Sequence, residues 1–318
     1  PSRVTAVTSG TSATSVCAAE RSSTTATLRS SRTNAGRTPA SHVTTSMAHT
    51  APVGSVGHGC SEGSDEPLSS NPARPRSSAF RCPNALTATS SPATATASDA
   101  DPSAADTSGF FDEAATQLGN DYGLFADLLD RVRYAYRKSY TNVNLELAKL
   151  SQKDGQAITQ FCRTLYEHTF FARYHYQKAE KIARLTLQMA PAIRQFFEGG
   201  WLEWYALVQA LSASEQRSVP LSYARGVKVT FPNEDLHELD VLLQPQGQEP
   251  ICIECKTGEF RRDIDKYVRL NKRLGLAKSR FILCCTDLNA EQAQGLSAMY
   301  DLSFVPLPML KRHLHSMI

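Results

Sequence analysis

The pattern of apolar and polar positions changes twice along the chain and divides it into three parts. From residue 1 to about residue 108, Ser, Thr, Ala, Pro and Gly dominate. Few large apolar residues are available there to offset the entropy lost on ordering the backbone, so we expect 1–108 to be a disordered, low-complexity tail. Residues 109–198 and 199–318 instead carry the periodic apolar patterns of folded chain.

The part from 109 to 198 has the spacing of helices. Apolar residues recur every four positions along its first segment, at Leu124, Leu128, Val132 and Tyr136. A second helix is predicted over 155–170 and a third over 173–189, because both runs contain good helix formers and almost no Gly or Pro. We therefore expect an α-helical region ahead of the last part of the chain.

The part from 199 to 318 alternates between helical and strand-like runs. The expected helices cover 201–211, 262–274 and 289–300, and the expected strands cover 226–231, 238–243, 250–256, 280–285 and 302–305. Residues 276–305 can form a strand-helix-strand crossover. This order predicts an α/β fold with a restriction-endonuclease-like mixed sheet flanked by helices.

Composition narrows the class of protein only slightly. A net charge of +3 in 318 residues permits a polyanionic partner without requiring one. The eight cysteines are irregularly spaced, and several lie in apolar runs, which favours reduced thiols and a cytoplasmic protein. No apolar run approaches the roughly 20 residues that span a bilayer, so we expect no membrane segment. The tail is Arg-rich and acid-poor like an organelle transit peptide, or it is sequence from outside the true coding region.

Candidate chemistry lies in the second and third strands of the last part. Side chains alternate between the faces of a strand, so Cys252, Glu254 and Lys256 share one face. A hairpin across residues 245–248 would place Asp240 beside Glu254. Two carboxylates and one ammonium group would then meet at one end of the hairpin.

This set of side chains suits metal-assisted hydrolysis of phosphodiester bonds. Magnesium takes oxygen ligands, commonly one or two carboxylates with water and substrate phosphate. Asp240 and Glu254 can supply the carboxylates, while Lys256 can orient the attacking water or stabilise charge on the phosphate. The sequence therefore predicts an Mg²⁺-dependent or Mn²⁺-dependent endonuclease.

An acid on one strand followed by Glu-x-Lys on the next resembles the PD-(D/E)xK nuclease superfamily. Three segments, 199–203 (GGWLE), 238–241 (ELDV) and 253–258 (IECKTG), resemble the nuclease domain of the Card1 and Can2 type effectors, once a domain of unknown function. The resemblance covers 199–318 only and adds Glu203 to Asp240 and Glu254 as a metal ligand, with Leu239 in place of the family's proline. We see no pattern before residue 199 for the family's cyclic oligoadenylate sensor, so control by such a ligand is not inferred.

Three readings stay open for the chain: a nuclease, a nuclease subunit that cleaves only within a larger defence or repair complex, and a non-catalytic protein. Glu254 and Lys256 could be a solvated pair on an edge strand of a non-catalytic nucleic-acid-binding or scaffold protein. The joint placement of these charges in apolar strands and of Glu203 in an apolar helix favours the nuclease. A basic helix follows the motif and offers contacts to DNA or RNA through Arg261, Arg262, Lys266 and Arg269. Cutting both strands of a duplex would favour a homodimer.

Overall fold

The computed structural model describes residues 3–6, 86–90, 93–99, 102–106, 109–231 and 236–318. Most of the tail that the sequence predicts to be disordered lies outside these residues. Within the tail the structure places three strands and a 3-10 turn: β1 (Arg3–Ala6), β2 (Leu86–Ser90), β3 (Ala93–Asp99) and η1 (Pro102–Ala105). All of the described residues belong to a single compact unit, and the domain boundary between 198 and 199 stays a prediction.

The region before residue 198 contains helices and a small sheet. Its helices are α1 (Phe111–Asn120), α2 (Tyr122–Arg137) and α3 (Gln152–Glu167). Its strands are β4 (Asn142–Glu146), β5 (Phe171–Gln177) and β6 (Ile182–Leu187), which form an antiparallel sheet in the order β4-β6-β5. The first two predicted helices are thus confirmed as α2 and α3.

The helix predicted over 173–189 is wrong, because β5 and β6 occupy that run as a hairpin. Ala183, Leu185 and Leu187 are buried in alternation with less buried neighbours, which is the period of a strand. Lys181 closes the turn with a φ of 54°, a left-handed conformation that no helix continues. Pairing with β4 therefore outweighed the helix propensity of this run.

A broken helix leads into the last part of the chain. It consists of α4 (Pro191–Gln195), a π-helical turn η2 (Phe196–Gly200) and α5 (Trp201–Arg217), with a kink at Gly199 where φ is 153°. α1 packs closely on α5, since a Cβ added at Gly119 would overlap the ring of Tyr205. No helix in the described ranges is long and apolar enough to cross a membrane.

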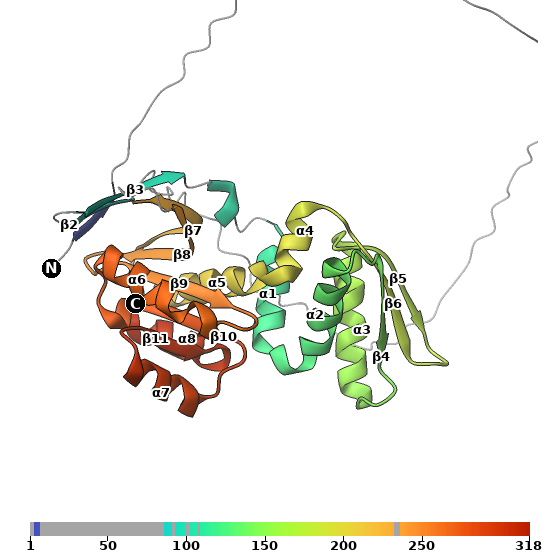
Figure 1. Cartoon of the computed structure of the whole chain (residues 1–318). Coiled ribbons are helices and arrows are strands. Elements are labelled where there is room, and N and C mark those ends of the chain that lie inside the picture. Colours follow the sequence, from blue (N-terminus) through green and yellow to red (C-terminus); the bar gives the residue numbers. More distant parts are fainter. Residues whose placement is uncertain (1–2, 7–85, 91–92, 100–101, 107–108, 232–235) are drawn as a thin grey trace, which may run out of the picture. The chain divides into compact units, whose positions relative to one another are not determined.

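Strands β1, β2 and β3 form one end of the main sheet, which continues from β3 in the order β7-β8-β9-β10-β11 (Figure 1). These strands are β7 (Leu221–Thr230), β8 (Leu236–Pro245), β9 (Ile251–Lys256), β10 (Phe281–Cys285) and β11 (Ser303–Pro306). β7, β8 and β9 run antiparallel, whereas β9, β10 and β11 run parallel. The predicted mixed sheet, the hairpin at 245–248 and the crossover over 276–305 are confirmed.

Helices cover both faces of this sheet. α5 and α8 (Leu307–Met317) share a core with Val241, Ile253 and Ile282 on one face. α6 (Ile264–Leu274) and α7 (Ala290–Met299) pack with Cys252 and Leu283 on the other. Short 3-10 turns, η3 (Arg261–Asp263) and η4 (Lys278–Arg280), precede α6 and β10. All five residues of β10 are buried, as expected for a parallel strand covered on both faces.

The alternation of side chains slips by one residue where β7 and β8 cross the middle of the sheet. In β8, Val241 and Leu243 pack in the core beneath α5, yet Leu239 packs in the core beneath α6. The slip falls at Asp240, and Gly226 lies opposite it in the register with a φ of 62°. The left-handed conformation at Gly226 lets both strands change faces together. Asp240 therefore lies at a discontinuity of the sheet.

Candidate active site

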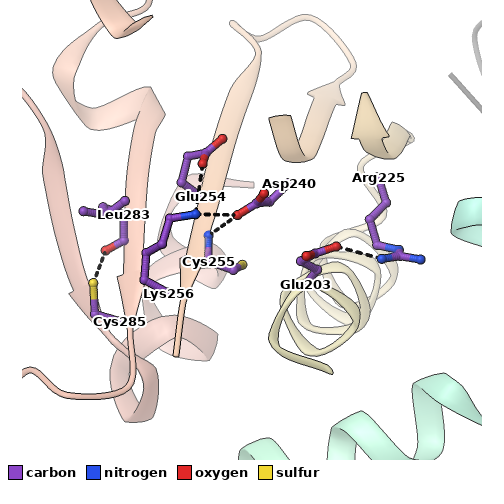
Figure 2. Close-up of polar contacts among 8 residues, drawn as sticks. All are labelled: Glu203, Arg225, Asp240, Glu254, Cys255, Lys256, Leu283 and Cys285. Carbon is purple, nitrogen blue, oxygen red and sulfur yellow. Dashed lines mark hydrogen bonds and ion pairs between the residues drawn. The ribbon is translucent and has the colours of Figure 1, made fainter. Parts of the chain in front are cut away.

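Asp240 lies where the backbone ladder between β8 and β9 ends. Val241 and Ile253 form the last pair of that ladder. Beyond this pair, the side chain of Asp240, and not a backbone carbonyl, accepts the hydrogen bond from β9. Its Oδ2 accepts a hydrogen bond of 2.7 Å from the backbone N–H of Cys255 (Figure 2). This bond holds the Asp240 carboxylate against β9, at the position where the side chains of β8 change from one face of the sheet to the other.

Lys256 joins Asp240 and Glu254 into one cluster. Its Nζ lies 3.2 Å from Asp240 Oδ2 and 3.4 Å from Glu254 Oε2 (Figure 2). All three side chains are largely shielded from water. The structure thus brings together the Asp240, Glu254 and Lys256 that the sequence predicts to meet, at the carboxyl end of β9.

Glu254 is the most deeply buried member of the cluster. The residue is only 2% exposed, and its Oε1 has no hydrogen-bond partner within the described part of the chain. Burial raises the pKa of this carboxyl well above its ordinary value, and the nearby Asp240 raises it further against the opposing effect of Lys256. An ionised carboxylate here has an unsatisfied oxygen, which a second cation would stabilise.

The ammonium group of Lys256 stays protonated in this setting. Burial by itself would lower the pKa of Lys256, but the carboxylates of Asp240 and Glu254 outweigh it and raise the pKa above the usual lysine value. The ring of Tyr267 on α6 lies beneath the ammonium, with Nζ 5.1 Å from the ring centroid. Lys256 is therefore a fixed positive charge and hydrogen-bond donor, not a proton acceptor.

Glu203 comes from α5, on the opposite side of Asp240 from Glu254 (Figure 2). Its Oε2 forms an ion pair of 2.7 Å with Nη1 of Arg225 on β7. The guanidinium of Arg225 also stacks over Trp204, 4.4 Å from the ring centroid. Burial and then Asp240 raise the pKa of Glu203 to about 7, in spite of Arg225. Glu203 is close enough to Asp240 for their charges to interact, but its carboxylate is bound to an arginine.

The donor set fits a hard divalent cation. Within the residues that the structure describes, no group of three or more His, Cys, Asp or Glu side chains is arranged to hold a metal ion. Magnesium, however, is commonly held by one or two carboxylates with water completing its shell. Asp240 and Glu254 supply that number, and Oε1 of Glu254 has no hydrogen-bond partner among the described residues. The chemistry of these two carboxylates fits Mg²⁺ or Mn²⁺.

The four basic residues proposed to contact nucleic acid all lie on the surface. Arg261 and Arg262 belong to η3, and Lys266 and Arg269 belong to α6; all four are exposed. Arg261 forms an ion pair of 3.4 Å with Glu259. α6 lies on the same face of the sheet as Glu254 and Lys256, because its Tyr267 contacts Lys256. These cations thus belong to the elements that cover this face of the sheet, and their contact with nucleic acid stays a prediction.

Sequence reasoning missed Arg225, and it did not predict that Arg133 contacts the site. Arg225 lies in β7, but the predicted strand began only at the next residue, Gly226. A charged Arg among the apolar residues Leu221, Tyr223 and Ala224 was the signal that could have indicated a functional role. Arg133 of α2 donates a hydrogen bond of 2.5 Å to the carbonyl oxygen of Thr257, the residue after Lys256. No local pattern could have revealed that contact, because 124 positions separate its partners.

No protein-family model and no curated protein matches the chain. Among solved structures, protein VC1899 from Vibrio cholerae is similar at a TM-score of 0.48 and 18% identity, over 71% of this chain and 57% of that one. Can2 from Sulfobacillus thermosulfidooxidans, in complex with cyclic tetra-adenylate, is similar at a TM-score of 0.48 and 14% identity, over 65% and 56%. The chain thus spans little more than half the length of either protein, and neither likeness assigns it an activity.

Proposed function

We propose that this protein is a metal-dependent nuclease of the PD-(D/E)xK type, which hydrolyses phosphodiester bonds of DNA or RNA. One observation carries the proposal: Asp240, Glu254 and Lys256 converge at the end of β9, and a buried oxygen of Glu254 finds no partner among the residues that the structure describes. Structural ion pairs seldom leave such an oxygen unsatisfied, because burying it costs free energy. Clusters of this kind with perturbed pKa values are typical of functional sites.

Asp240 and Glu254 are the residues that would hold Mg²⁺ or Mn²⁺. When bound, the ion polarises a phosphate oxygen and lowers the pKa of a coordinated water. The hydrogen bond from the Cys255 N–H fixes Oδ2 of Asp240, so the direction of this carboxylate is set before any ligand arrives. Preorganisation of this kind lowers the cost of assembling the site.

Lys256 supplies a positive charge that can act on the substrate in the proposed reaction. As a fixed cation it can donate a hydrogen bond to the attacking water or to a phosphate oxygen on which negative charge increases. In the hydrolysis, the water oxygen forms a bond to phosphorus while one P–O ester bond breaks. The departing oxygen takes up a proton from solvent, and the water proton is released to solvent.

Glu203 is the third carboxylate of the proposed site, and Arg225 sets its position. Arg225 holds its Oε2 at 2.7 Å, so the side chain is not free to move onto a metal while that pair is intact. Its pKa of about 7 means that a small change in charge nearby alters its protonation at neutral pH. We therefore expect Glu203 to adjust the site and Asp240, Glu254 and Lys256 to be indispensable.

The test is cleavage of labelled single-stranded and double-stranded DNA and RNA by the full chain, with Mg²⁺, Mn²⁺ or EDTA. We expect metal-dependent cleavage, and we expect Asp240→Asn and Lys256→Ala each to reduce it by about 100-fold or more. Asp265→Asn on α6 and Lys311→Ala on α8, at two exposed positions, serve as matched controls and should cleave normally. Circular dichroism spectra establish that every variant is folded.

One feature favours a second candidate function. Lys256 already neutralises part of the charge on both carboxylates, as it would in a nuclease fold that has become a nucleic-acid-binding module. Such a protein would bind nucleic acid with or without metal and never cut it. Binding without cleavage under every metal tested would therefore replace the nuclease by this alternative.

A further inference from the structure

A groove runs between the carboxyl-terminal half of α2 and strand β4. It has a volume of about 550 Å³ and is lined by Arg131, Arg133, Tyr134, Arg137, Tyr140 and Asn144, among others. Positive charge dominates, since Asp130 is the one acid among the lining residues. Cationic and aromatic side chains in one groove are the combination that holds single-stranded nucleic acid.

The two tyrosines of the groove present their rings to solvent. Tyr134 is 49% exposed and Tyr140 is 55% exposed, and their ring centroids lie 6.3 Å apart at an angle of 62°. The position of Tyr140 is set by the end of α2, where its N–H donates to the carbonyl of Ala135 and Ser139 adopts a φ of 58°. Two held but exposed rings offer faces on which bases can stack.

The arginines of the groove differ in whether they form ion pairs. Arg131 pairs with Asp127, and Arg133 pairs with Asp130. Arg137 is exposed, and no ion pair to it is found among the residues that the structure describes. It is therefore the lining cation best able to bind a phosphate, while the two paired arginines contribute to the surrounding positive potential.

Arg133 connects the groove to the candidate active site. It lines the groove, and its Nη1 donates to the carbonyl oxygen of Thr257, which directly follows Lys256. Arg133 thus contacts both the groove and the backbone at the end of β9.

We propose that this groove binds an unpaired segment of a nucleic-acid strand, with bases stacked on Tyr134 and Tyr140 and a phosphate on Arg137. The proposal rests on the nuclease function and adds to it the site that holds the substrate beside the scissile bond. An unpaired segment is favoured over a duplex, because paired and stacked bases do not present their faces to a protein.

The experiment measures binding separately from cleavage. Fluorescence anisotropy in EDTA records the binding of the full chain to a labelled single-stranded oligonucleotide and to the same sequence as a duplex. Tyr134→Ala and Tyr140→Ala should each weaken single-strand binding by about 5- to 100-fold, whereas Tyr134→Phe keeps the ring and should change it less than about twofold. Arg137→Gln should weaken binding and lower its dependence on salt.

The controls lie on α3, outside the groove. Tyr166 is 45% exposed there and Arg163 is also exposed, so Tyr166→Ala and Arg163→Gln match the groove variants in chemistry. If the groove variants bind like these controls, or the wild type does not bind the single strand, the groove proposal is wrong. Equal weakening of duplex binding would also overturn it.

The outcomes separate this proposal from the nuclease proposal. Loss of binding in the tyrosine variants of a protein that never cleaves would support the groove and reject the nuclease. Normal cleavage and normal binding in those variants, with cleavage lost in Asp240→Asn, would support the nuclease and reject the groove.

Discussion

The end of β9 and the groove beside α2 both gather charged side chains, but they hold them in opposite ways. Asp240, Glu254 and Lys256 are largely buried and depend on one another for neutralisation. The pairs of Arg131 and Arg133 with their aspartates are substantially exposed to water. Removing one buried partner leaves the others uncompensated, whereas an exposed pair contributes little by itself. We therefore expect large, mutually dependent effects on cleavage at β9 and small, additive effects at the paired arginines of the groove.

The largest effect is expected for Glu254→Gln. This substitution keeps the shape of the side chain but removes the negative charge, so metal-dependent cleavage should fall by about 100- to 1,000-fold. In EDTA, urea unfolding at pH 8 should show a free energy within about 1 kcal/mol of the wild type, because the buried oxygen without a partner no longer carries charge. Glu259→Gln, at an exposed position, is the control. Full cleavage by the Glu254 variant would contradict the assignment of this residue.

An intermediate effect is expected from pH on the metal-free protein. Folding raises the pKa of Glu203 from 4.5 to about 7, so the folded state binds this proton more tightly than the unfolded state does. The stabilisation is fully present below pH 4.5 and is lost as the pH rises through 7. We expect the free energy of unfolding in EDTA to fall by about 1–3 kcal/mol from pH 5 to pH 8.

Glu203→Gln should reduce this pH dependence without abolishing it, because Glu254, whose pKa burial also raises, still titrates in the variant. Glu215→Gln, an exposed position on the same helix, should leave the dependence unchanged. Urea unfolding at four or five pH values measures all three proteins, and Mg²⁺ at pH 8 should restore stability to the wild type if the cluster binds it. An equal pH dependence in Glu203→Gln and the wild type would show that the proton resides elsewhere.

The smallest effect is expected on the exposed face of α6. Arg262→Gln and Arg269→Gln should each weaken binding of nucleic acid by about two- to threefold at low salt and should reduce the slope of log affinity against log salt by about 1. Lys311→Gln, exposed on α8 across the sheet, should change neither quantity. Salt titrations of binding measure this. A decrease as large as that of the tyrosine variants would remove the distinction between the groove and α6.

Much of the fold was predictable where local periodicity decides the structure. The alternation in β9 placed Glu254 and Lys256 on one face, and the turn at 245–248 predicted the hairpin that brings Asp240 near them. The same reasoning failed over 173–189, because its charged and aromatic residues suit either a helix or a strand. Pairing of β6 with both β4 and β5 decided that case, and such pairing is not visible locally.

The sequence by itself determined which residues are the candidates for the chemistry, because the period of two in a strand and the apolar setting of the charges are local properties. Only the tertiary structure decided how those residues are engaged. The face change at Asp240 needs Gly226 on the neighbouring strand, and Glu203 is held by Arg225 from that same strand. Arg133 reaches Thr257 across 124 positions of sequence. Contacts of this kind depend on packing between distant segments, because that packing both buries a charged group and supplies the partner that neutralises it.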